Sequence, residues 1–378
     1  MSTIHSAIAC NVDTNILLAS LPLFDAEKIQ AIEWAFDAVF RHDALPDWFD
    51  ALLRTYADAN RLVGHGVFFS LFSGRWTPDQ QAWLTQLKTL AATYRFDHIT
   101  EHFGFMTGAD FHKGAPLSIP LTQSTLAIGQ DRLRRIQDAG GCPVGLENLA
   151  FAYSLDEVKR QGDFLHRLLE PVNGFIILDL HNLYCQSHNF GLAGDELLAL
   201  YPLEQVREMH ISGGSWSASD SEPGRQIRRD THDEAVPDAV FDWLEGAIDR
   251  CPNLRYVVLE QLGSGLTTEA DQEQFRNDFL RMDRIVEGKN QVRAASQPNL
   301  FRNISGVLPS SMPLEDDDLH WQQRELATIL ETAADYRQAR ALLATSGLAH
   351  SAWEIERWEP AMLETAMAIA QKWQHGFD

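Results

Sequence analysis

Short apolar runs that end on an acidic, imidazole or amide side chain recur along this chain. The clearest is Ile176–Asn182, in which a β-branched run finishes on Asp179, His181 and Asn182. The same pattern is found in Leu62–His65, Phe96–His102, Pro143–Asn148, Val206–His210 and Tyr256–Glu260. Short apolar runs rich in β-branched residues are typical of buried parallel strands. We therefore expect parallel strands that each end on a polar group.

Amphipathic segments separate these runs. Thr77 and Pro78 form an N-cap followed by proline at the first helical position, and Ser154 with Glu157 forms a capping box. The expected helices are Asp47–Ala59, Thr77–Ala92, Thr122–Gly140, Ser154–Leu169, Asp195–Leu200, Pro237–Cys251 and Thr267–Glu287. A first strand is expected at Ser6–Val12, and Ile29–Phe36 is ambiguous between strand and helix. The polar segments 104–121 and 213–233 are expected to be loops.

This alternation predicts an α/β protein with a (β/α)8 barrel of the TIM type at residues 1–288. A doubly wound sheet is the main alternative. After Gly288 the composition changes, and residues 289–318 read as a linker. A helical extension is predicted at 319–378, with helices at His320–Thr345 and Ser351–Gln374. This extension either packs on the barrel or recruits a partner.

The charge balance narrows the range of partners. The 378 residues carry a formal charge of −22, which argues against nucleic acids and anionic membranes as partners. No apolar run is long enough to span a membrane, and the first residues do not resemble a secretory signal. The four cysteines, Cys10, Cys142, Cys185 and Cys251, form no C-x-x-C pair. Isolated cysteines fit a reducing compartment, so we expect a cytoplasmic protein.

The polar strand ends are candidate metal ligands. In a (β/α)8 barrel the C-terminal ends of all strands meet at one mouth. The candidates are His65, His102, Glu147, Asp179, Asn182, His210, Asp230, His232 and Glu260. Clustered carboxylates need cations or protons, and imidazole with carboxylate but no thiolate suits Fe, Mn or Zn. So many ligands exceed the needs of one ion, which favours two or three ions bridged by Glu147 or Asp179.

Other residues are candidates for outer contacts or for substrate binding. Asp97 and Glu101 could orient imidazoles by hydrogen bonding, or simply cap loops. His181 is either an added ligand or a neighbour of the ligands. Arg225, Arg228 and Arg229 form a basic cluster before Asp230 that could grip a carboxylate or lie in solvent.

These residues together resemble the multinuclear non-haem iron-dependent oxidative enzymes, the family of the methanobactin-biosynthesis oxidase. The resemblance covers roughly residues 6 to 285 and rests on the order and spacing of seven stretches. These stretches are Gly64–Leu71, Thr100–His102, Gly145–Asn148, Leu178–Tyr184, Glu208–Gly213, Asp230–His232 and Leu259–Glu260.

The resemblance implies a TIM-type barrel that holds two or three iron ions, with the nine candidates above at the family's ligand positions. It also implies O2-dependent oxidation of cysteine or another residue in a ribosomally made precursor peptide, often presented by a partner protein. The chain departs from the family at His181, where Asn is usual. It also departs at Asn189-Phe190, where Asn-His is usual and His188 lies next door, and at Gln261-Leu262, where Arg-Asp is usual. The extension beyond Gly288 is unusual as well.

Three functions remain open on this basis. The first is an iron-dependent oxidase that modifies a peptide. The second is a Zn- or Mn-dependent isomerase or phosphoesterase on the same metal site, since such enzymes need the same ligands. The third is a non-catalytic scaffold, which a clustered set of acids and imidazoles disfavours.

Overall fold

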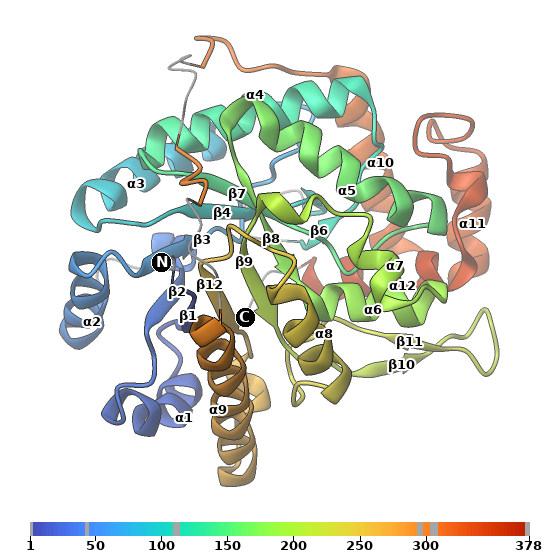
Figure 1. Ribbon diagram of the computed structural model, residues 1–378. Coiled ribbons are helices and arrows are strands. Elements are labelled where there is room, and N and C mark those ends of the chain that lie inside the picture. Colours follow the sequence, from blue (N-terminus) through green and yellow to red (C-terminus); the bar gives the residue numbers. More distant parts are fainter. Residues whose placement is uncertain (1–2, 42–44, 109–113, 293–297, 303–308, 375–378) are drawn as a thin grey trace.

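Eight parallel strands close into a barrel in the computed structural model, which describes residues 3–41, 45–108, 114–292, 298–302 and 309–374 (Figure 1). The strands are β1 (His5–Ala9), β2 (Ala31–Ala35), β3 (Leu62–His65), β4 (Ile99–His102), β7 (Val144–Glu147), β8 (Phe175–Asp179), β9 (Val206–Ile211) and β12 (Tyr256–Leu259). They follow one another around the ring in chain order, and β12 pairs with β1. The predicted barrel is confirmed, and its closure excludes the doubly wound sheet. The ambiguous segment at 29–36 is the strand β2.

The interior of the barrel contains an apolar cluster, polar side chains at the C-terminal ends of the strands, and a buried group of polar side chains around His98 and Arg207. Alternate residues of each strand face inward. The apolar part is a cluster of mostly small side chains: Ala7, Ala31, Val63, Tyr256 and Val258. Phe301, from the segment after the last barrel helix, packs on Phe175 and Ile177 at the N-terminal end. Below the mouth the interior is therefore filled by packed apolar and polar side chains.

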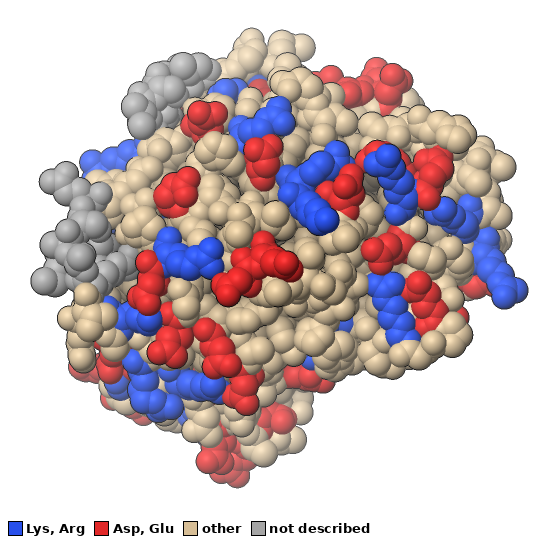
Figure 2. Space-filling view, turned by 45° about the vertical axis from the view of Figure 1, so that its right-hand side comes forward, with Lys and Arg blue, Asp and Glu red and all other residues tan. Residues whose placement is uncertain are grey.

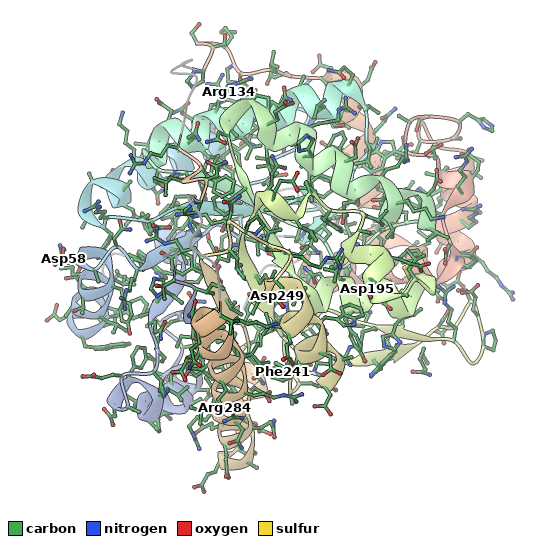
Figure 3. All side chains as sticks on the ribbon, in the orientation of Figure 1. Asp58, Arg134, Asp195, Phe241, Asp249 and Arg284 are labelled. Atoms are coloured by element: carbon green, nitrogen blue, oxygen red, sulfur yellow. The ribbon has the colours of Figure 1, made fainter. Side chains whose placement is uncertain are left out.

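Helices surround this ring and hold it in place. They are α1 (Thr14–Asp25), α2 (Asp47–Asp58), α3 (Pro78–Thr93), α4 (Gln123–Gly140), α5 (Leu155–Leu169), α6 (Leu180–Phe190), α7 (Gly194–Leu198), α8 (Asp238–Ile248) and α9 (Glu269–Val292). Short 3-10 turns occur at η1 (Phe36–Arg41), η2 (Glu170–Val172), η3 (Leu203–Gln205) and η4 (Gly263–Gly265). Charged side chains such as Asp58 and Asp249 point outward, whereas Phe241 of α8 faces α9, where Arg281 lies 4.1 Å from its ring centre (Figure 3).

The capping predictions are confirmed in part. Thr77 forms the reciprocal capping box with Gln80 at the start of α3. Ser154 caps α5 through the N–H of Glu157, but the reciprocal bond is missing. The Glu157 carboxylate instead accepts a hydrogen bond from the backbone N–H of Tyr153 at 2.8 Å. The Glu157 carboxylate, which would accept from the N–H of Ser154 in a capping box, therefore binds the N–H of the preceding residue instead.

Several elements differ from the sequence expectations. Helices α1 and α6 were not expected; Asp13 caps the first and Asp179 the second. Each expected loop contains a two-stranded antiparallel hairpin, β5 (Phe105–Met106) with β6 (Pro116–Leu117), and β10 (Trp216–Ala218) with β11 (Gln226–Arg228). Helix α9 continues to Val292, into the predicted linker, of which residues 293–297 and 303–308 lie outside the described ranges.

The expected helix at 320–345 is two helices, α10 (Asp317–Thr332) and α11 (Tyr336–Ala344). The break occurs because Ala333 is extended and Asp335 caps α11. The segment at 351–374 begins with η5 (Ile355–Arg357), and its regular helix α12 (Pro360–Trp373) starts at Pro360, as the proline indicated.

The extension packs against loops on the mouth side of the barrel. The Gln323 amide donates to the carbonyl of Phe72 at 2.8 Å and accepts from the N–H of Gly74 at 2.9 Å. The segment before α10 runs along α4, where Arg132 and Arg135 donate to the carbonyls of Leu314 and Ser310. The loop that follows β3 and the helix α4 are therefore covered by the extension.

The surface mixes both signs of charge. On the face shown in Figure 2, Lys and Arg side chains alternate with Asp and Glu side chains, so this face has no continuous basic track for a polyanion. None of the described helices combines the length and apolar character needed to cross a bilayer.

Candidate metal centre

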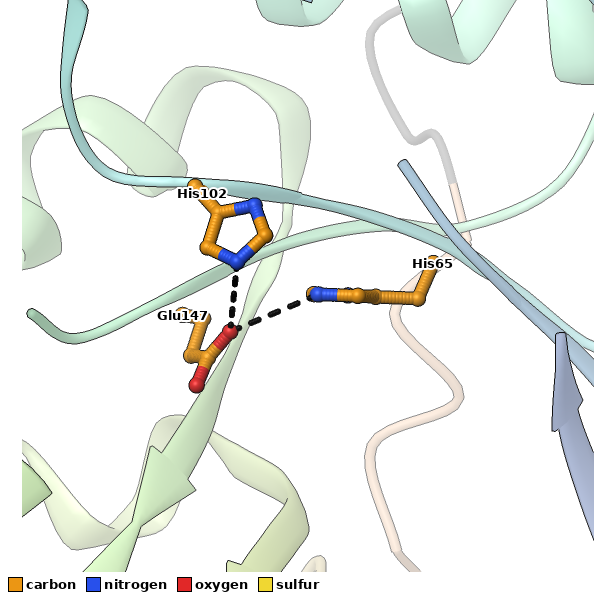
Figure 4. Close-up of side chains that lie close together, drawn as sticks. All are labelled: His65, His102 and Glu147. Carbon is orange, nitrogen blue, oxygen red and sulfur yellow. Dashed lines mark ion pairs between the residues drawn. The ribbon is translucent and has the colours of Figure 1, made fainter. Parts of the chain in front are cut away.

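His65, His102 and Glu147 converge at the ends of three neighbouring strands, β3, β4 and β7 (Figure 4). The Nε2 atom of each histidine lies 3.5 Å from Oε2 of Glu147. Donor atoms of the three residues all lie within 4.8 Å of one another, an arrangement that could hold a metal ion.

A second group of donors shares Glu147 with the first. It consists of Glu147, Asp179, His210 and Glu260, whose donor atoms also lie within 4.8 Å of one another. Nδ1 of His210 is 3.8 Å from Oε1 of Glu147 and 3.3 Å from Oε2 of Glu260. The two oxygens of Glu147 therefore face different donor groups, as a bridging carboxylate does.

The tautomer of His65 follows from its neighbour Thr100. The Thr100 hydroxyl donates to the carbonyl of Gly64 at 3.2 Å, so its oxygen accepts from Nδ1 of His65 at 2.8 Å. Nδ1 therefore carries the proton. The lone pair of His65 is left on Nε2, the atom that faces Glu147.

Asp179 and Asn182 are placed by the start of α6. One Asp179 oxygen caps the helix by accepting from the N–H of Asn182 at 2.6 Å, and Oδ2 has no hydrogen-bond partner. The Asn182 amide donates to Glu147 at 3.2 Å and to the carbonyl of Asn148 at 2.8 Å. The cap uses one oxygen of Asp179, and the two donated bonds use the amide nitrogen of Asn182, so Oδ2 of Asp179 and Oδ1 of Asn182 remain free acceptors.

Asp230, His232 and His181 pair with one another at the edge of the centre. Oδ1 of Asp230 lies 2.8 Å from Nε2 of His232 and 3.0 Å from Nδ1 of His181. His232 also lies 3.4 Å from Glu260 through Nδ1. Its backbone has φ of 52°, a left-handed conformation that costs a residue with Cβ about 1–3 kcal/mol. The fold bears that cost to bring His232 beside Glu260.

The centre holds an unusual number of buried polar atoms without a hydrogen-bond partner. Among the described residues these include His65 Nε2, Asp179 Oδ2, Asn182 Oδ1, His210 Nδ1 and Glu260 Oε2. Buried polar groups are nearly always satisfied, so such a cluster needs an explanation.

The same burial shifts the ionisation of the acids. Burial, with a contribution from Asp230, raises the pKa of Asp179 to about 7. Burial also raises the pKa of Glu147 well above its usual range, and the nearby Asp179 and Glu260 add to the effect. Without a cation, this site favours neutral carboxyl groups.

The other candidates from the sequence lie outside the two donor groups. Glu101 is buried against Gly66, and neither of its oxygens has a hydrogen-bond partner, so the expected bond to an imidazole is not found. His188 packs on the rings of Tyr184 and Trp216. Arg228 lies over the same two rings, with Glu234 at 3.6 Å.

Two inward-facing acids were missed by sequence reasoning. Glu33 of β2 lies 3.0 Å from Nε2 of His210, and Glu208 lies 3.6 Å from the same atom. Glu33 is the central residue of β2, in the segment that was ambiguous between strand and helix, and it does not stand at a strand end. Glu208 lies two residues before His210, so it shares the inward face of β9.

A groove of about 510 Å³ lies beside the β10–β11 hairpin, and α12 forms its other wall. Its lining includes Ser217, Ser219, Arg229, Tyr336, Glu364 and Ala368. Arg229, in this lining, directly precedes Asp230 in the sequence.

Known proteins similar to this chain include three curated bacterial relatives, each named only as a UPF0276 protein. The one from Pasteurella multocida is 29% identical over 219 residues, covering 53% of this chain and 70% of the relative. The one from Chromobacterium violaceum is 30% identical over 201 residues, with the same coverage of both chains. The one from Caulobacter vibrioides is 27% identical over 187 residues, which is 49% of this chain and 64% of the relative.

Solved structures similar in fold include the IOLI protein with a zinc atom and an L-ribulose 3-epimerase. The first is 12% identical with a TM-score of 0.47, covering 75% of this chain and 99% of the other. The second is 12% identical with a TM-score of 0.46, covering 79% of this chain and 100% of the other.

The family model described as RiPP precursor modification enzyme MbnB/TglH/ChrH matches residues 27–263. These residues contain seven of the eight barrel strands, all except β1. They also include every candidate ligand from His65 to Glu260. Since the match covers well over half of the chain, this protein belongs to the MbnB/TglH/ChrH family of enzymes that modify ribosomally made precursor peptides.

Proposed function

We propose that this protein is a cytoplasmic, iron-dependent oxidoreductase that uses O2 to modify cysteine, or another residue, of a ribosomally made precursor peptide. The observation that carries the proposal is the position of Glu147 between two groups of nitrogen and oxygen donors. In this proposal His65, His102 and Glu147 hold one ion, and Glu147, Asp179, His210 and Glu260 hold another. Asn182, Asp230 and His232 complete the coordination or hold a third ion.

The donor chemistry fits metal ions. Atoms with free lone pairs on two imidazoles, two carboxylates and an amide are buried without a hydrogen-bond partner in this centre. An uncompensated group of buried acids would be strongly unfavourable, and cations remove that cost.

The donor types favour iron among the metals. Two histidines and one carboxylate with open positions are typical of non-haem iron sites that handle O2. No thiolate belongs to either donor group. Iron held here would supply the redox chemistry and would favour the thiolate form of a substrate cysteine.

The residues of the chain have definite roles in this proposal. Thr100 keeps the Nε2 lone pair of His65 turned towards Glu147. Asp230 binds both His181 and His232 and so fixes the wall next to Glu260. The hairpin groove gives a peptide main chain space, and Arg229, the neighbour of Asp230 in the sequence, is one of its lining residues. The extension forms the other side of the groove, so we propose that it helps to present the peptide, with or without a partner protein.

Two of the three arginines of the basic cluster do not favour the phosphoesterase alternative. Arg225 is paired with Glu222 and, at 3.0 Å, with Glu359. Arg228 is held between aromatic rings. A phosphate would have to displace these contacts.

Metal analysis of anaerobically purified protein, with Mössbauer and EPR spectra, tests the proposal first. We expect two or three coupled irons per chain, and O2 consumption when cysteine-containing peptides from a screen are added. Stoichiometric zinc or manganese with no iron uptake would contradict the proposal and would favour an isomerase or hydrolase.

A further inference from the structure

A line of buried polar side chains runs along the barrel interior beneath the proposed metal centre. Nε2 of His98 donates to Oε2 of Glu208 at 2.6 Å, and Arg207 holds Asp97 at 2.7 Å beside the same imidazole. The other oxygen of Glu208 lies 3.6 Å from Nε2 of His210. Glu33, which belongs to a different strand, β2, lies 3.0 Å from the same Nε2 atom of His210.

We propose that Glu33, assisted by Glu208, is the positioning group that fixes the ring orientation and the tautomer of His210, so that Nδ1 is presented to the metal. The inference rests on the proposed metal centre, and it adds two residues that sequence reasoning did not select.

With Glu33 ionised and His210 neutral, as metal binding through His210 requires, the geometry leaves one arrangement of the His210 proton. An ionised carboxylate only accepts hydrogen bonds, so the nitrogen that faces Glu33 must carry the proton. That nitrogen is Nε2, at 3.0 Å from Glu33 Oε2. A neutral imidazole then has its lone pair on Nδ1, which is buried without a hydrogen-bond partner and lies 3.3 Å from Glu260.

The line beneath the centre holds Glu208 in place for this task. Its Oε2 is occupied by His98, so Oε1 is the oxygen turned towards His210. All three side chains are fully buried, and water does not compete for their contacts. Partners of this kind typically change metal affinity about 10- to 100-fold when they are removed.

The same three donors, Glu33, Glu208 and His210, lie within 4.8 Å of one another and could in principle hold an ion of their own. His98 already occupies one oxygen of Glu208, which leaves a poorer donor set than either group at the mouth. The number of ions bound distinguishes the two roles.

Co(II) titration of the metal-free full-length protein tests the inference, because the visible spectrum of Co(II) reports ligand geometry. The variants are Glu33→Gln and Glu33→Gln with Glu208→Gln. A glutamine can donate its amide to Nε2 and so permits the wrong tautomer. We expect Co(II) affinity to fall at least about 10-fold in the single variant and about 100-fold in the double variant, with a shifted spectrum.

Asp283→Asn is the matched control. Asp283 is a buried carboxylate on α9 that binds Ser6 and Lys28. Its neutralisation should leave the Co(II) affinity and spectrum unchanged. Thermal unfolding of each metal-free variant separates a general loss of stability from a loss of metal geometry.

NMR of the Co(II)-loaded wild-type protein provides a test that does not depend on folding of the Glu33 variants. The hyperfine-shifted N–H signal that disappears in His210→Gln should exchange slowly with D2O, because Nε2–H is buried against Glu33. Fast exchange, or wild-type affinity and spectrum in Glu33→Gln, would overturn the inference. Loss of a whole ion in that variant would also overturn it, in favour of a separate site. Failure of the wild-type protein to bind Co(II) or iron would instead overturn the proposed function.

Discussion

Tyr153 and Trp358 stack face to face, with ring centres 3.7 Å apart and an interplanar angle of 8°. Tyr153 lies in the loop after β7, six residues beyond Glu147, and Trp358 lies just before α12 in the extension. The N–H of Glu359 also donates to the Tyr153 carbonyl at 3.0 Å. The extension is therefore fastened to a loop that leads directly from the candidate metal centre.

This contact predicts that Trp358→Ala will lower the free energy of unfolding by about 3–5 kcal/mol, the usual cost of truncating a buried tryptophan. Trp321→Ala is the control, because Trp321 is 60% exposed and its loss should cost about 0.5 kcal/mol or less. Urea unfolding monitored by circular dichroism measures both values. Equal costs for the two variants would show that the stacking contributes little.

Glu147 and His102 should differ in how many ions their loss removes. Glu147→Gln affects both donor groups, so it should abolish binding of both ions. His102→Asn affects only the first group and should leave the second ion in place. Metal analysis after dialysis gives the counts, and identical losses in the two variants would contradict a bridging role for Glu147.

Asp179→Asn should have opposite effects on the metal-free and metal-loaded protein. Asparagine caps a helix about as well as aspartate, so α6 keeps its start. Burial raises the pKa of Asp179 from its usual value of 3.8 to about 7 in the metal-free fold. The folded state therefore holds this proton more tightly than the unfolded chain, and stability is lost as pH rises from about 4 through about 7.

Removing this acid should consequently stabilise the metal-free protein at pH 8 by on the order of 1–3 kcal/mol, with little effect at pH 4. The same variant should bind metal more weakly at both pH values. Urea unfolding at the two pH values, with and without metal, checks this, and a variant that is less stable than wild type without metal at pH 8 would refute it.

The hairpin groove predicts a defect confined to the peptide. Ala368 is an exposed residue of α12 that lines the groove, so Ala368→Trp should fill it without touching a donor. We expect kcat/KM for the peptide to fall on the order of 10-fold, which is about 1.4 kcal/mol, with unchanged metal content. Ala341→Trp, on an exposed position of α11, is the control. An equal fall of kcat/KM in both variants would show that the groove is not where the peptide binds.

Most of the fold could be predicted from the local pattern of apolar and polar residues. Apolar β-branched runs that alternate with amphipathic segments have few solutions other than a parallel barrel, and the polar residues at their ends then share one mouth. Helix α6 escaped prediction because it starts directly after β8, with Asp179 serving as both strand end and cap. Local signals also predicted that the last regular helix starts at Pro360, because proline is tolerated in the first turn of a helix but not in its interior.

What the sequence by itself determined is therefore the barrel and the set of acids and imidazoles at its strand ends. Only the tertiary structure decided which of them face one another. Thr100, Glu101 and His102 are consecutive, yet Glu101 lies outside the centre because successive residues of a strand point to opposite faces. Glu33 reaches His210 across the barrel because closure of the ring brings β2 and β9 to the same interior, a proximity that no local sequence signal contains.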